Sequence, residues 1–477
     1  MAAERGPDGN LVLPLNITRP APVIDFTFKW ATAGGGLRSP PAKSEAAPDL
    51  TPQPELGSIP PTATERVQFE DQMGFLKARE SALGFPLTKF AGPWTGNGFN
   101  TIFVPLPFGE KVQEFKGVGF NDNLLVIDLT TEQWTFGPTL GDIPNRGFGL
   151  QGDIHLHGVP YLQTVQRVTD KLTGRPRIPS INKPEGIHFE PGMFLLVPPA
   201  ATFHQGEPLG RGSVVRMASI PHGTTINAQG PIPKKIVTPE TPTGGFKGGP
   251  RFSPLDITPF KIGNPFKKEV DSFPSVTALS NPFRDPQNLQ PFLTAETLTM
   301  EMVKNPHKFL ERAVDGQKIV ETVVFEVHTG QEGKSTPPAL MNGGGTTNIA
   351  FLAGAQSEVT TRAPNPGKPN AHAESMVNTW WVETVMYDVE VDPMAGNEIQ
   401  TWKPKMLDSK GKPSTAPTPE FLLKAPPAGV PKKTTFKVPG TQIQYSQVVN
   451  LNFGGLSWPH VSVATLVPKE PQFFPLP

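Results

Sequence analysis

The sequence predicts a mainly β protein with two related antiparallel barrels, and three observations support this fold class. Proline and glycine are abundant, at 58 and 47 of 477 residues, and both disfavour long helices. Short segments of alternating apolar and polar residues recur between about 90 and 230 and again after 318. A tetrapeptide also appears twice, as Ser-Ile-Pro-His at 219–222 and Ser-Trp-Pro-His at 457–460. This recurrence indicates an internal duplication.

Weaker matches follow in the same order along the two halves. Phe-Asn-Thr-Ile-Phe at 99–103 resembles Thr-Asn-Ile-Ala-Phe at 347–351. An aromatic residue followed by period-two alternation occurs at 161–168 and again at 381–388, with Thr-Val at the same place. The order of the matches is preserved although their spacing is not, so the duplication predicts two barrels with loops of different length.

The first predicted domain spans 66–230, after an extended Pro-rich arm over 1–65. A short helix is expected within 66–90, where apolar residues recur at helical spacing. Beyond it, β-prone segments alternate with Gly- and Pro-rich breakers, as between 141 and 147. Seven or more strands in about 140 residues are typical of an antiparallel barrel or sandwich. We favour a barrel, because closure removes exposed strand edges.

A Pro-rich linker over 231–317 joins this domain to the second predicted barrel at 318–477. The linker contains one predicted helix at 294–315, with Thr294 as N-cap and Gly316 after its end. Pro306 is expected to bend this helix or to split it in two. The second barrel is interrupted by a polar, Pro-rich insertion near 392–440.

Composition argues against several partners. Lysine plus arginine equals aspartate plus glutamate, at 43 each, so no net charge attracts nucleic acid. The chain has no cysteine, which excludes disulfides and thiolate metal sites. Eighteen apolar residues never run together, and the N-terminal residues lack the apolar core of a secretion signal. We therefore expect a soluble, cytoplasmic protein without a membrane span.

The two Pro-His pairs are the first candidates for chemistry. A neutral imidazole at the end of an apolar strand can ligate haem iron, and this makes His222 and His460 candidates. The alternative is architectural: Pro221 and Pro459 shape a bulge, and each histidine bonds to a neighbouring loop. Since both copies carry the pair, its repetition supports either interpretation.

A second candidate is the pair His155 and His157. Two residues apart on a strand, they project from the same face at roughly 7 Å. Together with His188 or Glu190 they would provide ligands for a divalent metal. A hydrogen-bonded polar cluster is the alternative interpretation.

Two arginines complete the candidate site. Arg146 lies in a turn before the histidine strand, and Arg216 lies on the strand that leads to His222. Facing into a barrel, they would pair with a ligand carboxylate. The alternative is a structural salt bridge to Asp153 or Glu190.

Four segments resemble a broad group of uncharacterised microbial proteins described as haem-binding: Ala-Gly-Pro-Trp-Thr-Gly-Asn-Gly-Phe-Asn at 91–100, Ile-Pro-Asn-Arg-Gly at 143–147, Gly-Ile-His-Phe-Glu-Pro-Gly at 186–192 and Ser-Ile-Pro-His-Gly at 219–223. The first is also similar to the barrel entry of nitrobindin and other lipocalin-like barrels. The resemblance covers about 90–230 and 340–467. It implies a barrel of ten or so strands with an apolar cavity, a haem cofactor and an iron-ligating histidine late in the barrel.

The leading hypothesis is therefore two lipocalin-like barrels, the first of which binds haem or a similar apolar small molecule and has a possible peroxidase-like activity. His222 would be the axial ligand, His155, His157 and His188 would line the site, and Arg146 or Arg216 would face carboxylates. The alternative is a structural protein with filled barrels, whose N-terminal arm and linkers mediate oligomerisation. A metal-dependent enzyme at His155 and His157 is the third hypothesis.

Overall fold

The structure of the chain is a computed structural model. It describes residues 83–84, 86–105, 123–149, 152–168, 185–198, 203–204, 207–208, 212–220, 223–233, 252–268, 293, 298–330, 345–348, 372–453 and 456–477. The predicted arm at 1–65 and the residues 66–82 of the first predicted domain lie outside these ranges.

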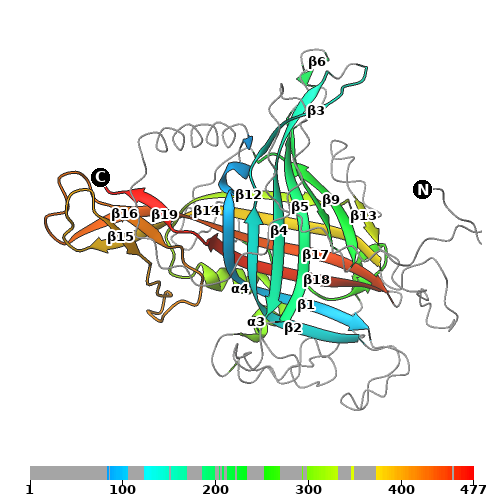
Figure 1. Cartoon of the computed structure of the whole chain (residues 1–477). Coiled ribbons are helices and arrows are strands. Elements are labelled where there is room, and N and C mark those ends of the chain that lie inside the picture. The colour runs from blue at the N-terminus through cyan, green and yellow to red at the C-terminus, as the bar shows by residue number, and fades with distance from the viewer. Residues whose placement is uncertain are drawn as a thin grey trace, which may run out of the picture. The chain divides into compact units, whose positions relative to one another are not determined.

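Ten antiparallel strands form one closed barrel (Figure 1). The first strand pairs with the last, from Trp94 opposite Pro468 to Thr101 opposite Val461, and this pairing closes the sheet. In pairing order the strands are β1 (Gly92–Pro105), β2 (Asn123–Phe136), β4 (Ile154–Arg167), β5 (Glu185–Val197), β8 (Ser213–Ser219), β9 (Thr224–Pro231), β12 (Ile319–His328), β14 (His372–Val391), β17 (Thr434–Phe453) and β18 (Leu456–Pro468).

The prediction of two barrels is corrected by this strand order. The predicted domain at 66–230 supplies β1 to β9, and the predicted domain at 318–477 supplies β12 to β18 of the same barrel. The halves meet at two seams, β18 with β1 and β9 with β12, the latter through Gln229 opposite His328. Each half taken alone would expose two strand edges, and joining the halves pairs all four.

The repeated tetrapeptide occupies two different structural settings. The first copy runs from the end of β8 toward β9, and its Pro221 and His222 lie outside the described residues. The second copy lies inside β18, where Pro459 is opposite Asn450. The two copies are therefore not equivalent positions of two barrels, although the strand count agrees with the ten that the resemblance implies.

Aromatic side chains from strands around the barrel fill one half of its interior, which we call the aromatic half. Every barrel strand contributes to one buried apolar cluster. Phe90, just after the short 3-10 helix η1 (Leu87–Lys89), closes this end and contacts the ring of Trp380 with the centroids 5.5 Å apart. The largest side chains of the aromatic half are Trp94, Trp134, Phe136, Tyr161, Phe194, Phe325, Trp380 and Tyr445.

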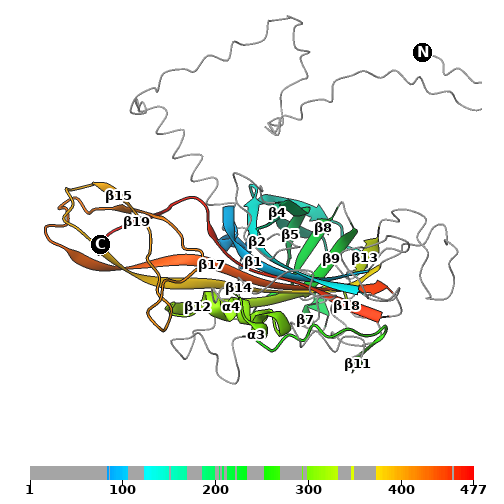
Figure 2. The ribbon, with the colours of Figure 1, turned by 90° about the horizontal axis from the view of Figure 1, so that it is seen from below.

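Two short helices cover part of the outer face (Figure 2). They are α3 (Met300–Lys304) and α4 (His307–Ala313), so the single helix predicted at 294–315 is split at Asn305 and Pro306. Thr299 caps α3 by accepting from the Met302 amide. Buried residues of both helices, such as Met302 and Leu310, pack in a second apolar cluster with outward-facing residues of β1, β2, β14, β17 and β18.

Two barrel strands are extended, and several short strands complete the structure. β14 and β17 are long, with 20 residues each, and the three-stranded sheet of β15 (Ile399–Trp402), β16 (Phe421–Lys424) and β19 (Gln472–Pro475) lies beyond one barrel end in Figure 1. Further short strands are β3 (Leu140–Asn145), β6 (Phe203–His204), β7 (Glu207–Pro208), β10 (Phe260–Lys261), β11 (Asn264–Lys268) and β13 (Gly345–Asn348). In the described part of the chain, helices are too short or too polar to cross a bilayer.

The aromatic half predicts where the barrel is most sensitive to truncation. Trp380 is fully buried against Trp134, Phe325 and Tyr445. Trp380→Ala is expected to lower the free energy of unfolding by about 3–5 kcal/mol, measured by urea denaturation followed by circular dichroism. Phe266→Ala, at a side chain that is 80% exposed, is the control and should change stability by less than about 0.5 kcal/mol. Equal effects of the two substitutions would contradict a packed interior.

Candidate functional site

A buried ion pair lies at the centre of the barrel interior. Arg216 on β8 donates from Nη2 to Glu190 Oε1 on β5 at 2.6 Å, and both side chains are buried. Tyr161 on β4 donates to the same carboxylate oxygen at 2.5 Å and accepts from Arg216 Nε at 2.9 Å. Gly192 makes room for this tyrosine, because a Cβ there would lie 2.4 Å from the Tyr161 ring. The three side chains thus form one closed hydrogen-bonded unit.

Arg216 is committed to groups of the protein. Its Nη1 donates to Asn378 Oδ1 and to Gln447 Oε1, each at 2.6 Å. With the bonds to Glu190 and Tyr161, four of its five N–H donors are used. Aromatic rings surround the guanidinium, with centroids 5.5–6.0 Å from Cζ, from Trp134, Tyr161, Phe194 and Trp380. Arg216 therefore stabilises the interior and has little donor capacity left for a ligand.

The pKa values in the interior show how this charge is balanced. Burial raises the pKa of Glu190, but the Arg216 charge and the hydrogen bonds from His188 and Tyr161 outweigh it, so the pKa falls from 4.5 to about 2. Burial also opposes the charge of Arg216, and Glu190 more than compensates, so the pKa of Arg216 is raised. Both members of the pair are charged at neutral pH.

A second buried carboxylate, Glu132 on β2, is hydrogen-bonded by neutral groups in the described part of the chain, and no cation there bonds to it. Its Oε2 accepts from the Tyr445 hydroxyl at 2.6 Å, from Gln163 Nε2 at 3.2 Å and from Trp134 Nε1 at 3.3 Å. Burial nevertheless dominates and raises the pKa of Glu132 above 4.5. The interior thus holds two carboxylates whose pKa values are shifted in opposite directions.

The other end of the interior is polar, and we call it the polar end. His188 Nε2 is hydrogen-bonded to Glu190 Oε2 at 3.0 Å, and the His188 side chain is 17% exposed. His460 Nε2 and Ser462 Oγ both contact Asn100 Oδ1, at 2.9 and 2.8 Å. His460 and Ser462 are only half-buried, although both lie on the interior face of β18. Water therefore reaches the polar end but not the aromatic half.

An ion pair crosses between two strands at the polar end. Arg167 on β4 contacts Asp128 on β2 through Nε at 2.5 Å and Nη2 at 3.0 Å. It also reaches Glu185 at 3.3 Å. This bidentate pair joins strands that are hydrogen-bonded neighbours.

The predicted cluster of His155, His157 and His188 does not form in the structure. His155 and His157 lie where β4 pairs with β3, and His155 is exposed; Figure 1 shows these strands projecting past the barrel. His188 is opposite Val165 of β4, eight residues from His157 and so about 26 Å away along the strand. Among the described residues, three or more His, Asp or Glu side chains nowhere gather as a metal site would need.

The predicted arginines form the salt bridges that were the alternative to ligand binding. Arg146 Nη1 contacts Asp153 Oδ2 at 2.6 Å, and its side chain is 87% exposed. Arg216 pairs with Glu190. Arg146 is therefore on the surface near His155, whereas Arg216 and His188 share the interior. His222 lies outside the described residues.

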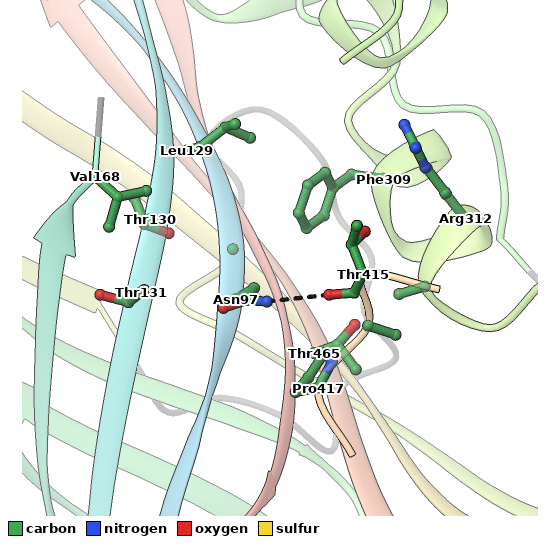
Figure 3. A pocket seen from close by; sticks show the side chains of 13 residues that line it. Asn97, Leu129, Thr130, Thr131, Val168, Phe309, Arg312, Thr415, Pro417 and Thr465 are labelled. Atoms are coloured by element: carbon green, nitrogen blue, oxygen red, sulfur yellow. Dashed lines mark hydrogen bonds between the residues drawn. The ribbon is translucent and has the colours of Figure 1, made fainter. Parts of the chain in front are cut away.

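A groove on the outside of the barrel was not predicted. It lies between α4, the outer face of the wall around β1, and the loop at 415–417 (Figure 3). Its volume is about 240 Å³. Asn97 Nδ2 donates to the Thr415 carbonyl at 3.3 Å and ties this loop to β1. The groove is lined by Asn97, Gly98, Leu129, Thr130, Thr131, Val168, Phe309, Arg312, Ala313, Thr415, Ala416, Pro417 and Thr465.

Helix spacing explains the helical wall of the groove. Phe309, Arg312 and Ala313 are three and four residues apart on α4, so they share one face. The Phe309 ring stacks on Phe99 of β1, with centroids 5.7 Å apart and an interplanar angle of 18°. Figure 3 shows Phe309 and Arg312 across the groove from Leu129. The sequence predicted a helix over this region, but not the strands against which it packs.

Comparisons with known proteins identify no relative. No family model matches the sequence. No curated protein matches it, and no solved structure matches it. The resemblance to haem-binding and nitrobindin-like proteins therefore stays a prediction.

The shifted pKa of Glu190 predicts a pH dependence of stability. The folded-state value, about 2, is below the unfolded value near 4.5. The stabilisation is therefore complete above pH 4.5 and is lost as the pH falls toward 2, by roughly 3 kcal/mol. In the double variant Glu190→Gln, Arg216→Met this part of the slope should disappear. Urea denaturation at intervals from pH 6 to pH 3 measures it, and equal slopes in both proteins would contradict the assignment.

Proposed function

We propose that the protein binds a small, largely apolar molecule in the groove between α4 and the barrel wall. One observation carries the proposal: the groove is a concave, mainly apolar surface with a single charged lining residue, Arg312, whose side chain has no ion pair or hydrogen bond among the described residues. Small-molecule sites are usually concave and mostly apolar, with a few polar groups that fix the orientation of the ligand.

The barrel interior offers less support for this role. Its aromatic half is filled by buried side chains, and Arg216 is bonded to protein groups on most of its donors. The rigid barrel is then a scaffold, and the site forms where a helix and a loop meet its outer wall. The apolar small molecule that the sequence predicts would then bind outside the barrel rather than in its interior.

A groove-filling substitution tests this proposal. Ala416→Phe, on the loop wall, should weaken binding of phenylacetamide, an uncharged aromatic probe, at least about tenfold, because the new ring occupies the groove. Saturation-transfer NMR and a titration of chemical shifts measure binding to the full chain. Ala395→Phe, at an exposed alanine on another loop, is the matched control and should bind as the unchanged protein does. Undetectable binding of any aromatic probe would contradict the proposal.

Haem at the polar end is a second candidate, supported by one observation. His188 and His460 project into the barrel there and keep part of their exposure, and imidazole is a common iron ligand. The aromatic half does not fit a porphyrin, because it is filled with side chains. A bound haem would therefore lie at the polar end, where the interior cation Arg167 is already paired with Asp128 and Glu185.

Hemin titration tests this second candidate. We expect a Soret band that is absent from the free protein and that shifts or weakens in His460→Ala or in His188→Ala, because one of them would hold the iron. His155→Ala, at an exposed histidine far from the polar end, is the control and should leave the spectrum unchanged. If added hemin gives no protein-dependent Soret band, haem binding and the predicted peroxidase-like activity both fail. Oligomerisation through the arm and a cytoplasmic location stay predictions.

A further inference from the structure

We propose that the ligand of the groove is a small aromatic monocarboxylate, whose ring enters the apolar groove and whose carboxylate pairs with Arg312. The inference rests on the proposed function and names the chemical class that this site selects. Two features carry it, the charge at the rim and the dimensions of the groove.

The charge argument begins with the neighbours of Arg312. It is half-buried and the only charged residue of the lining, and within the described chain its guanidinium has neither an ion pair nor a hydrogen bond. The nearest acidic residues along the chain have other partners: Glu311 accepts from Lys308 at 2.7 Å, and Asp315 accepts from Ser409 Oγ at 3.0 Å.

A guanidinium binds a carboxylate through two parallel hydrogen bonds, and its charge strengthens both. Partial burial strengthens such a pair further, because less water screens it. A ligand cation would be repelled at the same place, and the lining offers it no carboxylate. The charge therefore favours an anion with planar, two-oxygen geometry.

The size argument limits the rest of the ligand. A cavity of about 150 Å³ accommodates benzene, and sites for drug-sized ligands begin near 300 Å³. The groove, at about 240 Å³, lies between these values and suits one ring with a short side chain.

The shape of the walls favours a ring over a flexible chain. The Phe309 ring is held by stacking on Phe99, so it presents a fixed aromatic surface, and Figure 3 shows Leu129 on the opposite wall. A flat ring between these walls gains aromatic contact on one side and apolar contact on the other. Arg312, one helical turn from Phe309, is then placed to meet a substituent of that ring.

A comparison of ligands with nearly the same shape tests the inference. Phenylacetate and phenylacetamide differ by one charge and are close in size, so each is titrated into the full chain and followed by isothermal calorimetry or NMR. We expect phenylacetate to bind about tenfold or more tightly than phenylacetamide, as a charge-assisted pair would give. Phenethylamine should bind more weakly than both.

Two variants show whether Arg312 carries the preference. Arg312→Met keeps the apolar stem and should remove the advantage of phenylacetate over phenylacetamide, because the charge that distinguishes the two ligands is gone. Arg312→Lys should restore part of the advantage, because it keeps the charge but loses the fork geometry. A purely structural arginine would change the binding of both ligands equally.

The outcomes separate this inference from the proposed function. If both ligands bind equally and Ala416→Phe weakens both, the groove binds apolar molecules and the carboxylate inference fails. If phenylacetate binds but Ala416→Phe has no effect on it, the anion lies elsewhere and the inference also fails. If neither ligand binds the unchanged protein, the proposed function fails together with the inference.

Discussion

Pairing of the first barrel strand with the last is the constraint on which the rest of the structure depends. β1 and β18 are more than 350 residues apart in the chain, yet they share a register of eight residue pairs. Closure satisfies the backbone groups that two open sheets would leave at their edges. It also makes the two halves of the sequence interdependent, because each half alone would leave its two edge strands unpaired and could not close into a barrel.

Closure creates an interior, and the sequence fills it in two ways. In the aromatic half, alternate positions carry tryptophan, tyrosine and phenylalanine, which pack around the barrel axis. The polar atoms of these side chains are ring N–H and O–H groups, and those of Trp94 and Trp134 are hydrogen-bonded. At the boundary between the halves, charges are buried, and they are tolerated because Glu190 and Arg216 neutralise each other and because Tyr161, Asn378 and Gln447 satisfy their remaining bonds. Glu132, bonded only to neutral donors, instead has its pKa raised by burial.

The candidate ligand site arises outside, at the same seam that closes the barrel. α4 packs on the outer side of β1 and β18 because its apolar face is complementary to outward residues such as Phe99 and Val463. Short helices cover only part of this wall, and the loop near Thr415 covers another part. The groove is the space that remains between them, so its position follows from closure, and its chemistry follows from Phe309 and Arg312.

Local patterns in the sequence determined the β class, the strand segments and the break of the helix at Pro306, because each depends on neighbouring residues within a few positions. They also determined which residues are available for chemistry, including Arg216 and His188. Only the tertiary structure decided that two predicted barrels are one, because strand pairing across hundreds of residues is set by edge satisfaction and register, which leave no local signal. For the same reason His157 and His188 are far apart on paired strands. The Arg312 side chain, which has no ion pair among the residues that the structure describes, lies beside a groove whose other walls come from distant strands and a loop.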